Sequence, residues 1–140
     1  MRILAVDPGE KRTGLAVSDA AERMAVALPT LQMQGDGRDP DRIAKVAADV
    51  EAGRILVGLP LNMDGTEGPR ARTAREFADA LRQATPLPVE MWDERLSTAE
   101  GEARLRGAGL DRKELSRRSD MAAAIVILET YLESHKKRTD

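Results

Sequence analysis

The hydrophobic pattern changes near Gly37 from the period of strands to the spacing of helices, and this change limits the possible folds more than any other feature. Before it, short apolar and β-branched runs are separated by turn signals such as Asp7-Pro-Gly9 and Gly35-Asp-Gly37. These runs predict strands over residues 3–6, 14–18 and 24–28, the last extended past Pro29 to Met33. Because the connections are short, the first part of the chain is expected to form a three-stranded meander.

After Gly37 the apolar residues recur at helical spacing. Asp39-Pro40 predicts a helix start, because an Asp side chain can accept hydrogen bonds from the amides of the first turn and Pro has no amide to leave unpaired. The apolar positions of this helix are Ile43, Val46, Ala47 and Val50. Gly53 is expected to end it.

Two further strands are predicted to alternate with helices. The apolar run over residues 55–60 is typical of a strand buried on both faces, and a short strand is predicted over residues 89–92. Between them lies a helical face of Ala71, Ala74, Phe77, Ala78 and Leu81, stopped by Pro86 and Pro88. A capping box at residues 97–100 predicts another helix, and the apolar segment 121–132 predicts one packed into the domain. The tail from His135 is expected to fray.

This order of elements predicts a single α/β domain over residues 1–140, with a mixed five-stranded sheet flanked by helices. Hairpin connections make the first three strands antiparallel to one another. Crossover connections through helices place the last two strands parallel to the first.

The chain has no cysteine and one histidine, His135, near its end. Thiolate zinc sites and cysteine nucleophiles are therefore excluded and histidine chemistry is disfavoured, so carboxylates must carry any catalysis. The formal net charge of −2 disfavours indiscriminate wrapping of nucleic acid and requires a local basic patch instead. The first apolar stretch is too short for a signal peptide or a membrane span, so we expect a cytoplasmic protein without membrane contact.

Three carboxylates stand where predicted elements begin or end: Asp7 after the first strand, Glu94 after the last, and Asp120 at the start of the apolar helix. Neighbouring strand ends gather at one edge of an α/β sheet, and oxygen ligands alone favour Mg²⁺ or Mn²⁺. Each acid also has a structural interpretation, as a turn former, a partner of Arg95 and a helix N-terminal acid, respectively. Asp93 and Glu94 point to opposite sides of a strand, so which of them faces the metals stays open.

Several residues near this edge are candidates for binding phosphate. Basic and small residues occupy the first turn, the loop after the fourth strand, and the segments around the last two acids: Gly9, Lys11, Arg12, Asn62, Arg95, Arg117 and Arg118. Contacts of this kind position a nucleic acid without reading its sequence. The alternative is that these are solvated surface charges, which we expect for Arg70, Arg72, Arg75 and residues 136–138.

Four blocks, at residues 7–17, 57–65, 93–98 and 120–132, closely resemble the YqgF family, also called RuvX. They occur in the family's order and span nearly the whole chain. The resemblance implies a ribonuclease H-like fold related to RuvC junction resolvases. It places the family's acidic triad on Asp7, Glu94 and Asp120, with Arg117 and Arg118 where a lysine is expected.

The resemblance therefore implies a metal-dependent nuclease that hydrolyses phosphodiester bonds, with maturation of the 5′ end of pre-16S rRNA as the expected role. The alternatives are a Holliday junction resolvase and a non-catalytic nucleic-acid-binding module. An ATPase of the actin and sugar-kinase type shares the pattern of Asp7, Gly9, Lys11 and Gly14 but needs two domains. RNA or branched DNA as partner, and a monomer or homodimer, remain open. We expect the divalent cations to bind weakly without substrate.

Overall fold

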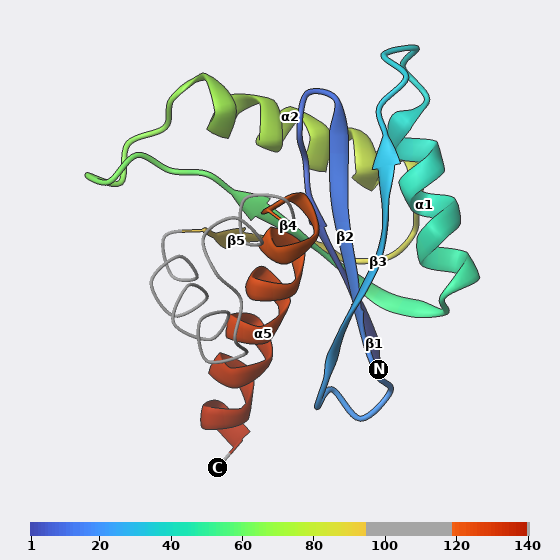
Figure 1. Cartoon of the computed structure of the whole chain (residues 1–140), viewed down its shortest axis with the longest axis vertical. Coiled ribbons are helices and arrows are strands. Elements are labelled where there is room, and N and C mark those ends of the chain that lie inside the picture. The colour runs from blue at the N-terminus through green and yellow to red at the C-terminus, as the bar shows by residue number, and fades with distance from the viewer. Residues whose placement is uncertain (95–118, 140) are drawn as a thin grey trace.

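A computed structural model of the chain describes the backbone of residues 1–94 and 119–139, and the side chains of residues 1–94 and 123–135 (Figure 1). In these segments one five-stranded sheet has helices on both faces. The strands are β1 (Arg2–Asp7), β2 (Arg12–Ser18), β3 (Ala25–Gln32), β4 (Ala52–Leu59) and β5 (Val89–Asp93). The helices are α1 (Asp39–Asp49), α2 (Pro69–Ala84) and α5 (Ser119–Thr139).

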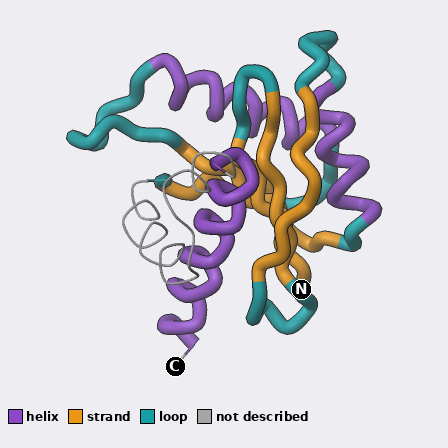
Figure 2. Tube along the Cα trace, viewed as in Figure 1, coloured by secondary structure: helices purple, strands orange, loops and turns teal. Residues whose placement is uncertain are grey.

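The sheet has the strand order β3-β2-β1-β4-β5, with β1 and β4 in its centre. β1 pairs antiparallel with β2, and β2 with β3, as the predicted meander requires. β4 is parallel to β1 and β5 is parallel to β4. All five predicted strands and the mixed sheet are therefore confirmed, and Figure 2 shows the strands as one continuous layer.

Alternate residues of the central strands bury their side chains in two separate cores. On one face, Leu4, Val6, Ile55 and Val57 pack with residues of α1 and α2, among them Ile43 and Leu81. On the other face, Ile3, Ala5 and Leu56 pack with Ile127, Leu128 and Tyr131 of α5. The predicted apolar helix over residues 121–132 thus packs on this face of the sheet, mainly over β1, β2 and β3. The period of two places Asp7 on that same face.

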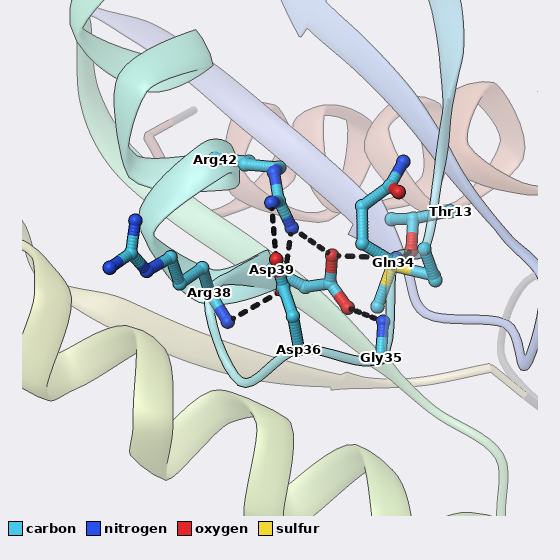
Figure 3. Close-up of polar contacts among 8 residues, drawn as sticks. Thr13, Gln34, Gly35, Asp36, Arg38, Asp39 and Arg42 are labelled. Atoms are coloured by element: carbon cyan, nitrogen blue, oxygen red, sulfur yellow. Dashed lines mark hydrogen bonds and ion pairs between the residues drawn. The ribbon is translucent and has the colours of Figure 1, made fainter.

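Asp39 does not cap its own helix as predicted, because its carboxylate is used by the preceding loop (Figure 3). It accepts hydrogen bonds from the amides of Gln34 (3.0 Å) and Gly35 (3.1 Å) and from the guanidinium of Arg42 (2.8 Å). The amide of Gln34 is the largest cause that lowers the pKa of Asp39. Arg42 also binds Asp36 through both terminal nitrogens, so this cluster fixes the connection from β3 to α1.

Two other predictions about element ends are wrong. Gly53 lies inside β4, and the chain leaves α1 through Glu51, which has a φ of 57°. The tail does not fray at His135, because α5 continues to Thr139 and the His135 ring stacks on Tyr131 with centroids 3.9 Å apart. The helix predicted from residue 97 lies outside the described residues. Among the helices that are described, none is long and apolar enough to cross a lipid bilayer.

Candidate active site

Asp7 and Glu94 meet at the edge where the parallel strands end. Asp7 is the last residue of β1, and Glu94 directly follows β5, with β4 between them. The backbone amide of Glu94 donates to the carbonyl of Leu59 at 3.0 Å, which fixes Glu94 to the end of β4. The two carboxyl groups are joined by a hydrogen bond, so the expected closeness of these two acids is confirmed.

A hydrogen bond between two carboxyl groups requires that one of them keeps its proton. The raised pKa of Glu94 explains why a proton is retained. The pKa of Glu94 is raised from 4.5 to about 8, first because burial disfavours the charged form and then because of the hydrogen bond and charge of Asp7. Asp93 adds a smaller repulsion, and Arg70 opposes the rise. At neutral pH the metal-free pair therefore carries one proton and one negative charge.

The side-chain alternation of β5 explains why Glu94, rather than Asp93, lies beside Asp7. Trp92 packs in the core beneath α5, so the period of two directs Asp93 to the other face and Glu94 back to the α5 face. The question that the sequence left open, which of the two acids approaches Asp7, is answered by this register.

The third candidate acid, Asp120, is the second residue of α5. The Asp120 side chain lies outside the described part of the structure. Among the side chains that are described, no three His, Cys, Asp or Glu residues gather as a metal site.

The Asp7–Glu94 pair nevertheless fits a divalent cation. Carboxylate oxygens are the donors that Mg²⁺ and Mn²⁺ prefer. A pair that retains a proton because burial and the neighbouring acid disfavour a second negative charge is also a place where a cation could replace that proton. The described residues therefore bring together two of the three acids that the sequence predicts to bind metal.

The candidate phosphate-binding residues divide into three groups. Lys11 and Arg12 are exposed in and just after the β1–β2 turn that begins at Asp7, and a Cβ on Gly9 would collide with the carbonyl oxygen of Arg12. Asn62 is exposed in the loop after β4, where its side-chain nitrogen donates to Thr66 Oγ1 at 3.0 Å. Arg95, Arg117 and Arg118 lie outside the described residues. Lys11 and Arg12 thus lie in the exposed hairpin that follows Asp7, while the Asn62 side chain bonds within its own loop.

Arg70, which the sequence predicts to be a solvated charge, also interacts electrostatically with Glu94. It is the second residue of α2, it is exposed, and its charge lowers the pKa of Glu94. The first turn of α2 contains no acidic residue, and its N-cap Gly68 makes no side-chain hydrogen bond. The signal in the sequence was Pro69, which marks a helix start only a short loop after β4 and so at the same sheet edge.

Comparisons with known proteins show the family and the fold. The family model described as "RuvX: Holliday junction resolvase" matches residues 1–134. A protein of Anaeromyxobacter sp. (strain K), named "Putative pre-16S rRNA nuclease", is 51% identical over 133 residues, which cover 95% of this chain and 97% of the relative. A protein of the same name from Thermoanaerobacter pseudethanolicus is 37% identical over 139 residues, covering 99% of this chain and 100% of the relative.

Solved structures show the same fold at low sequence identity. RuvC of T. thermophilus, in complex with a Holliday junction substrate, has a TM-score of 0.69 at 20% identity and covers 98% of this chain and 96% of its own. The Fowlpox virus Holliday junction resolvase has a TM-score of 0.57 at 14% identity, covering 96% and 99%. The predicted ribonuclease H-like fold is therefore confirmed.

Proposed function

The chain belongs to the RuvX family, and from this premise we propose that it is a metal-dependent nuclease that hydrolyses phosphodiester bonds in nucleic acid. The observation that carries the proposal is the proton-sharing pair of Asp7 and Glu94 at the carboxyl edge of the sheet. A non-catalytic binding module has no use for two crowded acids whose repulsion costs stability. A divalent cation removes that cost by replacing the shared proton.

In this proposal Asp7, Glu94 and Asp120 hold Mg²⁺ or Mn²⁺. When bound, the cation supplies positive charge that polarises the phosphate and activates a water molecule for attack. Glu94 would hold the cation as an ionised carboxylate, and its backbone bond to Leu59 fixes its main chain at the end of β4. Arg70, Lys11 and Arg12 bind substrate phosphates, and we expect Arg95, Arg117 and Arg118 to do so as well.

For the substrate, we propose RNA, and specifically the 5′ end of the 16S rRNA precursor, because relatives that match nearly the whole chain carry that name. The second candidate is a Holliday junction, which the description of the family model favours. In either case the partner is nucleic acid, and we infer a single-domain cytoplasmic protein that acts as a monomer or a homodimer.

A parallel cleavage assay tests the proposal. Three end-labelled substrates are incubated with protein and Mn²⁺: an RNA with the 5′ precursor extension of 16S rRNA, a single-stranded DNA, and a four-way DNA junction. We expect cleavage of the RNA that stops when the metal is chelated. Symmetric cleavage of the junction alone would replace the rRNA role by the resolvase role. Binding of all three without cleavage, across a range of Mn²⁺ and Mg²⁺ concentrations, would contradict the nuclease assignment.

A further inference from the structure

Given the proposed function above, we infer that Gly58 is a positioning residue for Glu94: its missing side chain leaves the space through which the Glu94 carboxyl group crosses β4 to reach Asp7. Gly58 is the buried, next-to-last residue of β4, and its strand neighbour on β5 is Trp92. The adjacent pairing of Val6 with Val57 sets Asp7 next to Gly58 on the other side. Gly58 therefore lies between the two acids.

The space above Gly58 is occupied by two side chains. A Cβ atom at this position would lie 2.5 Å from Glu94 Oε1, 3.2 Å from Glu94 Cδ and 2.7 Å from Ile127 Cδ1. Carbon contacts shorter than 3.0 Å essentially never occur, so even alanine would require one of these neighbours to move. The glycine is needed for this space and not for its backbone, because Gly58 is not among the residues with positive φ.

Glu94 is the neighbour that can move. Ile127 is 2% exposed and is held in the core between α5 and the sheet. The backbone of Glu94 is fixed by its bond to Leu59, but its side chain is only partly buried and has three rotatable bonds. An added methyl group at position 58 would therefore push the Glu94 carboxyl group away from Asp7 and separate the two ligands.

β4 provides a matched control at its other end. A Cβ atom at Gly53 would lie 2.7 Å from Met1 Sδ, which is as close as the contact with Ile127. Met1 is 57% exposed, so its side chain can turn away into solvent. Gly53→Ala thus makes the same substitution in the same strand, without a site residue in its path.

The experiment compares wild type, Gly58→Ala and Gly53→Ala in Mn²⁺-dependent cleavage and in the Mn²⁺-induced rise of Tm. We expect Gly58→Ala to lose about 10- to 100-fold in activity, as when a residue that orients a metal ligand is changed, and to lose most of the Tm rise. Gly53→Ala should keep both. In a Glu94→Gln background, Gly58→Ala should add little further loss, because residues that act through one another are not additive.

A second variant separates positioning from packing. Gly58→Ala combined with Ile127→Val removes the methyl group Cδ1 that an alanine would strike, so it should recover the metal-free Tm without recovering the Mn²⁺ response. Recovery of both would mean that Gly58 serves only the core, and would overturn the inference.

A crystal structure of Gly58→Ala, or of the double variant if the single one fails to fold, tests the geometry independently of any activity. We expect the Glu94 carboxyl group to be turned away from Asp7. If the Asp7–Glu94 hydrogen bond persists beside an alanine, the inference fails even though the nuclease proposal stands. If wild type neither cleaves nor responds to Mn²⁺ but the carboxyl group does move, the nuclease proposal fails and the positioning of Glu94 stands.

Discussion

Replacement of Asp7 by Asn distinguishes the effect of the acidic pair on folding stability from its proposed role in cleavage. Asn has the shape of Asp without the charge, so it leaves the burial of Glu94 unchanged but removes the repulsion by Asp7, which adds to the rise in the pKa of Glu94. We therefore expect the metal-free variant to be at least as stable as the wild type near pH 8, while its nuclease activity falls by about 100-fold or more, as when a strong electrostatic contributor is removed from a site.

The size of the stability effect follows from the pKa of Glu94. The pKa of this carboxyl group rises from 4.5 in the unfolded chain to about 8 in the folded one. It therefore lowers the free energy of unfolding in full at pH values above 8, and has no effect at pH values well below 4.5. The full cost is about 5 kcal/mol, at about 1.4 kcal/mol for each pH unit between the two values. Burial is the largest cause and persists in the variant, so we expect Asp7→Asn to recover on the order of 1–2 kcal/mol.

The assay is thermal unfolding of both proteins at pH 4 and pH 8, in the presence of a chelator. For a chain of this size, the recovered free energy corresponds to a rise in Tm of roughly 3–6 °C at pH 8. The gain should vanish at pH 4, where Glu94 is protonated in the folded and unfolded states alike. Wild type should correspondingly lose stability between pH 5 and pH 8 as the unfolded chain releases the Glu94 proton.

Asp93→Asn is the matched control, because it removes the same charge from the neighbouring residue. By the alternation of β5, Asp93 faces away from Asp7, so this variant should keep most of the activity. Full cleavage by a well-folded Asp7→Asn protein would refute the assignment of Asp7 as a metal ligand. Equal loss of stability and of substrate binding would instead show that Asp7 only shapes the turn after β1.

Three further predictions concern the surroundings of the site and the fold. Arg70→Ala should weaken RNA binding several-fold in a gel-shift assay and further raise the pKa of Glu94, whereas Arg72→Ala, at an exposed position of the same helix, should do neither. Mn²⁺ should raise Tm more with a non-cleavable oligonucleotide present than without it, because phosphate oxygens complete the coordination; equal shifts would argue against a shared metal site. Asp39→Ala should lower the free energy of unfolding in urea by about 1–3 kcal/mol, since it leaves the amides of Gln34 and Gly35 without their acceptor, while the exposed Asp41→Ala should change it little.

The sheet could be predicted from the sequence because its signals are local and repeated. Each strand is a short apolar run bounded by turn residues, and parallel strands follow from the helical spacing between residues 55 and 89. The ends of elements were less predictable. Asp39 has the residue type of an N-cap, but the loop before it folds back and uses its carboxylate, a contact that depends on where β3 ends.

The sequence predicted which acids are candidates for the site but not how their side chains lie relative to one another. Asp7 and Glu94 both follow predicted strands. The contact between their side chains depends on β4, which lies between them, and on the residue near the end of β4. The sequence contained the signal: Gly58 interrupts an otherwise apolar run, and an isolated glycine in a buried strand often marks a close approach of another group. What the run could not reveal is which group approaches. That depends on the register of β5, because a shift of one residue would exchange Asp93 for Glu94 and turn the wrong carboxylate toward Asp7. The pairing of the two proposed metal ligands therefore depends on the strand register and on Gly58 as much as on the acids themselves.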